Sequence, residues 1–405
     1  MRTRSALRRR RRVRAGASQL LGLLAGLALG IALPRITGGP MVPAGPVTEL
    51  VLALGLGLLG AIALIFSLLF LVVQWAATTF TPRLTLFRDA PIVWRTFALT
   101  IGLVVFSLTA VVATGDRTEV SAAVLVCELL LLLMLAVLLR SLQLKAFVAI
   151  QLAEVIASIA ERGHAILDSL YPVPTAAPGS PQGPGAAAEA LPGSGSTVVW
   201  PHPPRVLQQI DVDRLLRAAG AADAVVVLPH APGATLRRGA VVAEVHGGEV
   251  SAGAVLGALV TGKERTLEQD PTLALRLLAD IALRALSPAV NDPATAVQVL
   301  DDLEDLLSRP AATAAAAVRV RDDRGTVRVV VRLPGWEEVL RSTVDDLVVA
   351  SFASPMALNR MRALLRRLLE PAHADHRGPI VLRLGWLDDE EAARFARLRQ
   401  ERAGP

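Results

Sequence analysis

The chain has 405 residues, enough for a membrane region and one or two soluble domains. Hydrophobic residues make up 53% of it, more than is usual in a soluble chain, and the long uncharged runs all precede Arg140. The net charge of +6 includes eight arginines within residues 1–14; directly before an apolar helix, such a run indicates membrane topology, so nucleic acid is not expected as a partner.

Four segments reach the length of about 20 apolar residues that a helix needs to cross a bilayer. They are residues 15–34, a stretch within 50–74, residues 96–115 and residues 120–139. Their apolarity is unbroken rather than alternating, which favours helices over a barrel. The first segment resembles a signal peptide, but its 20 residues and the spans after it predict that it is retained. The single cysteine, Cys127, excludes an intramolecular disulfide.

The distribution of arginines predicts the orientation of these spans in the membrane. The N-terminal tail and the loop at 75–95, which holds three arginines, are more positive than the loops at 35–47 and 115–119, which hold one each. Because positively charged loops stay on the cytoplasmic side, both termini are expected in the cytoplasm.

The residues after the fourth span are predicted to form a mixed fold. An amphipathic helix leaves the membrane and ends near Tyr171, and a Pro/Gly-rich linker or loop follows it. Short β-like runs come next, at 224–228 and 240–245. The later elements are helices at 271–286, 293–308, 336–350 and 356–370, a hairpin at 318–333, a strand at 379–384 and a terminal helix from Asp388.

One β-like region resembles the small barrels that carry lipoyl or biotinyl groups. In PGATLRRGAVVAEV, Gly233 and Gly239 are spaced as in such a barrel. Those carriers need a modified lysine on a hairpin, and no lysine occurs between Lys145 and Lys263. The carrier interpretation therefore fails, and no cofactor is expected.

The densest polar pattern lies in Gly262–Leu307, which we call the signature segment. Asp270-Pro271 and Asp292-Pro293 each look like an N-cap followed by proline at the first position of a helix. Arg276, Asp280 and Arg284 fall at i, i+4 and i+8, on one face of the first helix. The segment predicts two helices joined by a tight polar elbow at Ser287–Pro293.

This segment also carries a family resemblance. RTLEQDPTLALRLLADIALRALSPAVNDPATA resembles the signature of a bacterial family of predicted integral membrane proteins, the domain of unknown function twenty-two fifty-four. The region Phe66–Asp89, IDVDRLL and PGATLRRG also resemble that family. The chain departs from the family pattern at Leu273, Leu277 and Ala294, where phenylalanine, glutamine and threonine are usual. The resemblance implies a fold and a bacterial inner (plasma) membrane location but no reaction.

The predicted fold class is therefore a membrane α-helical region of four transmembrane helices followed by a cytoplasmic α+β domain. Its expected parts are a basic tail (1–14), the transmembrane region (15–145), a membrane-exit helix (146–171), the linker or loop (172–199), a β-rich subdomain (200–260) and an α+β domain with the elbow (261–405).

Glu128 is the strongest single candidate for a functional residue. An ionisable group inside a span costs at least about 2.5 kcal/mol on insertion scales, so it usually faces the bundle interior and is functional. The alternative is that the helix shifts and places Glu128 near the outer interface.

The signature segment supplies a second candidate. A small anionic ligand could be held by arginines, which offer bidentate geometry. The alternative is purely structural: two caps, one helix ladder and a hydrogen-bonded turn. The ligand-binding candidates are Arg265, Asp270, Arg276, Asp280, Arg284, Ser287, Asn291 and Asp292.

His373, Asp375 and His376 lie at short spacing in an expected loop, but they do not form a recognised metal pattern, and no metal site is predicted. The leading hypothesis is an oligomeric channel-like or transport-related protein with a cytoplasmic sensing domain. The alternative is a membrane-anchored signalling or scaffold protein that binds a partner or a small anion. An enzyme is the weakest hypothesis, because no nucleophile or cofactor motif accompanies the acids.

Overall fold

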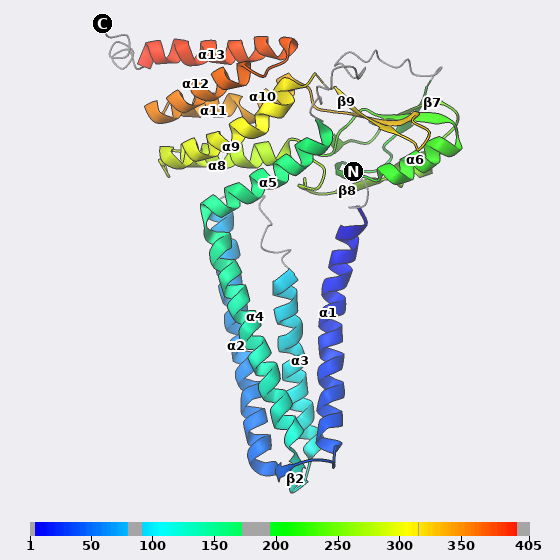
Figure 1. Ribbon diagram of the computed structural model, residues 1–405, viewed down its shortest axis with the longest axis vertical. Coiled ribbons are helices and arrows are strands. Elements are labelled where there is room, and N and C mark those ends of the chain that lie inside the picture. Colours follow the sequence, from blue (N-terminus) through cyan, green and yellow to red (C-terminus); the bar gives the residue numbers. More distant parts are fainter. Residues whose placement is uncertain (1–4, 80–90, 172–194, 315, 395–405) are drawn as a thin grey trace. The chain divides into compact units, whose positions relative to one another are not determined.

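The computed structural model describes residues 5–79, 91–171, 195–314 and 316–394 (Figure 1). The chain forms two compact units, Ala6–Val155 and, for the most part, Ile156–Pro405. The first holds four long apolar helices and the second is a mixed α/β region, so the predicted order of a helical region followed by a mixed one is confirmed.

The first unit contains one helix for each apolar run. These are α1 (Ser5–Ala32), α2 (Ala44–Thr79), α3 (Pro91–Thr114) and α4 (Ala122–Ile150). Each includes a stretch of 19 to 24 residues that is long and apolar enough to cross a membrane. A 3-10 turn at Leu33–Arg35 follows α1, and β1 (Met41–Pro43) pairs antiparallel with β2 (Glu119–Ser121). The two predicted outer loops therefore meet at one end of the bundle.

Helix α3 is the centre of this bundle. Half of its apolar stretch is buried, against 17% in each of the other three. A Cβ atom at Gly22 of α1 would lie 2.3 Å from the Ala98 carbonyl oxygen of α3, and one at Gly26 would lie 2.1 Å from that of Gly102. Only small residues allow two backbones to approach this closely. Many leucines of α1, α2 and α4 remain exposed, as a lipid-facing surface requires.

The second unit is built around two sheets. The larger has the strand order β3-β7-β5-β10-β9, in which β5 and β10 are parallel and the other pairs antiparallel. The smaller has the order β6-β4-β8 and is antiparallel. The strands are β3 (Ser196–Val199), β4 (Arg205–Ile210), β5 (Ala224–Leu228), β6 (Thr235–Leu236), β7 (Val241–Gly247), β8 (Leu259–Gly262), β9 (Ala317–Arg321) and β10 (Val327–Arg332).

Helices form the rest of this unit, and a shared apolar core joins α6 to both sheets through residues such as Leu215, Val226 and Leu207. The close approach of Gly163 in α5 to Ala274 and Leu306 packs that helix against α8 and α9. The helices are α5 (Leu152–Leu170), α6 (Val212–Ala221), α7 (Ala252–Leu256), α8 (Leu273–Ala285), α9 (Pro293–Ala312), α10 (Trp336–Thr343), α11 (Asp345–Ser351), α12 (Pro355–Leu369) and α13 (Ala374–Arg394).

The strand predicted at 379–384 is wrong, because these residues lie within α13. Ile380, Arg383, Leu387 and Glu391 are buried while Val381 and Leu382 are exposed, which is a helical period. The buried Arg383 binds Asp345 (2.5 Å) and Glu337 (3.0 Å) and so fastens α13 to α10 and α11. A short apolar run cannot by itself distinguish a strand from a buried helix turn.

Three predicted boundaries also change. The helix expected at 336–350 is two helices that meet at Val344, and the linker expected at 172–199 ends in strand β3, while residues 172–194 lie outside the described residues. The division at 260/261 runs through β8, and β10 from the later part pairs with β5 from the earlier one. Long-range strand pairing of this kind leaves no local trace in the sequence.

Candidate functional site

Glu128 is buried inside the helical bundle. Its side chain is 0% exposed, and the hydroxyl of Ser107 in α3 lies 3.0 and 3.2 Å from its two carboxylate oxygens. On the other side of Ser107, a Cβ atom at Gly55 of α2 would lie 2.9 Å from the Ser107 Cβ. Three helices therefore converge on this one polar pair.

The Ser107 hydroxyl has a second acceptor within reach, the carbonyl of Leu103 at 2.8 Å. A hydroxyl has one hydrogen, so it can satisfy only one of these acceptors at a time. When Ser107 donates to Leu103, a proton on Glu128 can be donated to the Ser107 oxygen; when Glu128 is ionised, Ser107 can turn to it. The pair can hold a proton in one arrangement and release it in the other.

In the signature segment, Arg265 and Asp270 form a closed ion pair. The Arg265 guanidinium donates to both Asp270 carboxylate oxygens, at 2.6 and 2.7 Å, and to the Thr272 hydroxyl at 2.6 Å. Asp270 is buried and also accepts the amides of Thr272 and Leu273. Helix α8 begins at Leu273 with Thr272 as its N-cap residue, so the predicted cap at Asp270-Pro271 is wrong, although the Asp270 carboxylate accepts the amide of Leu273.

The residues around this pair join the smaller sheet to α8. The Gln269 side chain accepts the amide of Ile210 in β4 at 2.9 Å. Gly233, in the predicted Pro232-Gly233 turn, has φ +103°, and a Cβ atom there would lie 2.4 Å from the Asp270 carboxylate. The segment Glu268–Asp270 and the turn at Pro232-Gly233 therefore contact each other, and together they form a structural joint between the smaller sheet and α8.

Arg276 and Asp280 are also paired. Arg276 donates to Asp280 (2.8 Å), to the Ser342 carbonyl (2.9 Å) and to Asp346 (3.1 Å), which ties α8 to α10 and α11. Arg284 belongs to the same predicted stripe, but it is exposed and forms no ion pair with the described residues.

The elbow at Ser287–Pro293 is a hydrogen-bonded turn. The Ser287 hydroxyl donates to the Arg284 carbonyl, and the Ser287 carbonyl accepts the amide of Asn291 at 2.8 Å. Asn291 has φ +49°, a left-handed conformation that asparagine adopts more easily than most residues. Asp292 caps α9 as predicted, and hydrogen bonds from the Thr295 hydroxyl and amide lower the pKa of its carboxyl.

His373, Asp375 and His376 surround the start of α13. The His373 Nδ1 atom lies 3.6 Å from an Asp375 carboxylate oxygen, and within the described residues no group of three or more ligands is placed to hold a metal. His376 instead stacks on Trp336, with ring centroids 5.3 Å apart, and its Nδ1 lies 2.9 Å from the Ala311 carbonyl. A carbonyl only accepts, so Nδ1 carries the hydrogen of this bond.

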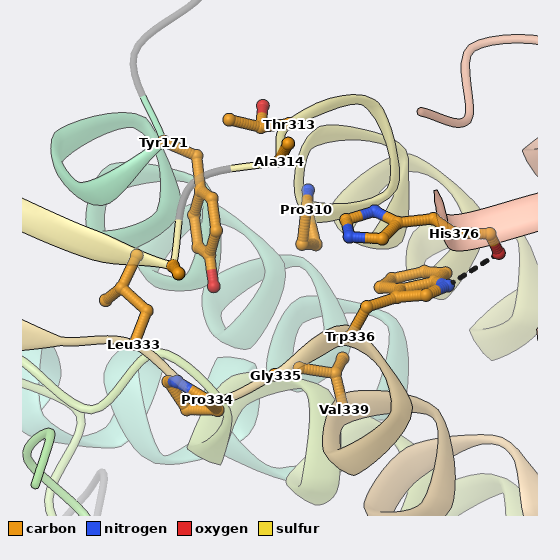
Figure 2. Close-up of a pocket in the computed structure, with 11 residues that line it drawn as sticks. Tyr171, Pro310, Thr313, Ala314, Leu333, Pro334, Gly335, Trp336, Val339 and His376 are labelled. Atoms are coloured by element: carbon orange, nitrogen blue, oxygen red, sulfur yellow. Dashed lines mark hydrogen bonds between the residues drawn. The ribbon is translucent and has the colours of Figure 1, made fainter. Parts of the chain in front are cut away.

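Trp336 and His376 form one wall of a cavity of about 120 Å³ within the second unit (Figure 2). Tyr171, at the end of α5, faces them, and Pro310 of α9 lies between. Burial raises the pKa of Tyr171 to about 12. The described residues that line the cavity are Tyr171, Pro310, Thr313, Ala314, Ala316, Leu333, Pro334, Gly335, Trp336, Val339 and His376.

Sequence reasoning missed this cavity and the α1–α3 contact. The cavity is formed by residues from widely separated parts of the chain, and no local pattern unites them. The contact does leave a signal, because Gly22, Gly26 and Gly30 recur at i, i+4 and i+8 in the first span.

Comparison with known proteins agrees with this organisation. A family model described as "Predicted membrane protein (DUF2254)" matches residues 17–367. The chain belongs to this family. It is also similar to uncharacterized protein Rv1290c of Mycobacterium tuberculosis and uncharacterized protein Mb1321c of Mycobacterium bovis. Each is 29% identical over 322 residues, a match that covers 75% of this chain and 60% of the relative's length.

The chain thus spans about 60% of the length of these relatives. No solved structure matches it. The family is one of predicted membrane proteins, in keeping with the four apolar helices.

Proposed function

We propose that this DUF2254 protein is a transport-related membrane protein in which Glu128 binds and releases a proton. The observation that carries the proposal is the complete burial of Glu128 between helices, with Ser107 as its hydrogen-bond partner. A charged group is costly inside a membrane-spanning bundle, and its presence is typical of a proton or ion pathway.

The geometry favours a proton over a metal cation. Calcium takes six to eight oxygen ligands and magnesium about six, as general coordination chemistry requires. Glu128 and Ser107, with the carbonyl of Leu103, offer four oxygens, whereas a proton needs only one donor–acceptor pair. The arrangement is therefore suited to protonation.

A channel-like mechanism would further require several copies. Helix α3 fills the centre of the four-helix bundle, so one copy encloses its most buried helix rather than an aqueous pore. We propose a homo-oligomer in the bacterial inner membrane, with both termini and the second unit on the cytoplasmic side. The positive-inside distribution of arginine supports that orientation.

The alternative, an anchored protein that binds a small anion at the signature segment, receives less support from the geometry. Arg265 and Arg276 would have to leave carboxylates that lie 2.6 and 2.8 Å away. Arg284 remains available, but a single exposed guanidinium is a weak anion site.

The test is proton flux in vesicles that contain the full chain. Glu128→Gln keeps the shape of the side chain but cannot ionise, and we expect it to lower flux at least tenfold. Glu119→Gln is the matched control, because Glu119 is an exposed acid just before α4. Equal flux in the wild type and Glu128→Gln, or no flux from folded wild type, would overturn the proposal.

A further inference from the structure

The cavity between Tyr171, Trp336 and His376 has walls that are already fixed. The Trp336 indole N–H donates to the His376 carbonyl at 3.1 Å, and the two rings stack (Figure 2). The His376 ring is held in turn by the Ala311 carbonyl. A ligand that enters would not have to order these side chains, which reduces the cost of binding.

One polar group in the wall has no protein partner. Tyr171 is only 4% exposed, yet its hydroxyl makes no hydrogen bond with the described residues, and it points into the cavity (Figure 2). A hydroxyl that faces a cavity is free to donate its hydrogen to an acceptor placed there.

The size and charge of the cavity restrict what can bind. Its volume of about 120 Å³ is comparable to the roughly 150 Å³ of an apolar cavity that takes up benzene. Among the described residues that line it there is no aspartate, glutamate, lysine or arginine. A charged ligand would be buried without a counter-ion, so a neutral one is favoured.

We propose that this cavity binds a neutral, ring-sized molecule whose apolar face packs against Trp336 and Pro310 and whose nitrogen or oxygen accepts the Tyr171 hydrogen. With Nδ1 of His376 carrying a hydrogen, the Nε2 atom of the neutral ring is left as an acceptor for a ligand that also has a donor. The site goes beyond the proposed proton transport and does not depend on it.

The probes are pyridine and benzene at alkaline pH, where pyridine is neutral; they have the same shape and differ in one acceptor. Binding to the full chain in lipid nanodiscs is measured by saturation-transfer NMR. Tyr171→Phe keeps the ring and removes the hydroxyl. It should weaken pyridine binding about tenfold, the worth of one hydrogen bond, and leave benzene binding unchanged.

A second pair of variants separates the cavity from the lipid. Ala314→Leu fills the cavity and should abolish binding of both probes, whereas Ala312→Leu, an exposed position on α9 outside the lining, should not. The proposal is overturned if neither probe binds the wild type, if the folded Tyr171→Phe variant keeps the preference for pyridine, or if both leucine variants bind alike.

Discussion

At the scale of single residues, Arg265 and Arg276 of the signature segment form ion pairs with acidic side chains. Arg265 binds Asp270, which accepts the first amide of α8, and Arg276 binds Asp280 and Asp346. Such pairs position helices more than they add stability, because the cost of removing charges from water offsets much of the attraction. The groups on which the two proposals rest lie elsewhere, at Glu128 and at the hydroxyl of Tyr171.

Tyr171 gives a prediction about alkaline pH. Its pKa of about 12 lies above the ordinary value of 10 because burial disfavours the phenolate. Ionisation of Tyr171 is therefore expected to destabilise the folded chain. Its contribution to the free energy of unfolding is fully present below pH 10 and is lost as the pH rises through 12, by about 3 kcal/mol at most. The measurement is tyrosinate absorbance during a pH titration.

The composition makes this titration easy to assign, because Tyr171 is the only tyrosine in the chain. Tyr171→Phe should abolish the absorbance change and retain more of its stability between pH 10 and 12. A midpoint near 10 in the folded protein would show that the hydroxyl is open to water.

The joint between the smaller sheet and α8 gives a second prediction. Gly233 and Gly239 both have positive φ, +103° and +81°, but only Gly233 faces a neighbour, the Asp270 carboxylate. Gly239→Ala should cost about 1 kcal/mol, the strain of a left-handed alanine. Gly233→Ala carries the same strain and also displaces a buried carboxylate, so about 3 kcal/mol is expected.

The comparison is made by thermal unfolding of the two variants in the same detergent. The Gly239 variant serves as the control for backbone strain, and the difference between the two reports the contact with Asp270. Equal losses would mean that the turn does not press on the carboxylate and that the joint is looser than its geometry implies.

At the scale of elements, the packing of α1 on α3 is set by glycine. Replacing Gly26 with valine would place a side chain where the Gly102 carbonyl lies, so α1 must separate from α3. We expect Gly26→Val to lower the melting temperature of the bundle clearly. Gly57→Val on α2 has nothing within 4 Å and should be nearly neutral. Similar melting curves for the two variants would contradict this packing.

Elements with a strong local signal could be predicted from the sequence. The four spans, strand β5, the hairpin of β9 and β10 and the Asp292 cap are all present because length, alternation and turn chemistry are properties of neighbouring residues. The run at 379–384 has no such local signal, because its helical conformation depends on the contacts of Arg383 with Glu337 and Asp345.

The candidate sites also differ in how much of each could be predicted from neighbouring residues. The burial of Glu128 in the bundle follows from its place in an apolar run. Its partner Ser107 comes from another helix and could not be predicted. The cavity joins α5, α9, α10 and α13, whose approach depends on tertiary packing alone. Its residues become related only when the chain is folded.

At the scale of the whole molecule, the placement proposed for the second unit depends on the orientation of the spans in the membrane. The arginine distribution predicts that Thr37 faces the outside and that Gln298, in α9, faces the cytoplasm. Both side chains are exposed, so each can be replaced by cysteine without disturbing a core. Cys127 is the only native cysteine and is first changed to alanine.

A membrane-impermeant thiol reagent then reads the orientation in intact spheroplasts. Thr37→Cys should be labelled at once, and Gln298→Cys only after the cells are broken. The Cys127→Ala background without a new cysteine gives the blank in both conditions. Labelling in the opposite order would place the second unit outside the cell; the proposal for Glu128 would stand, but the cytoplasmic placement of the second unit would not.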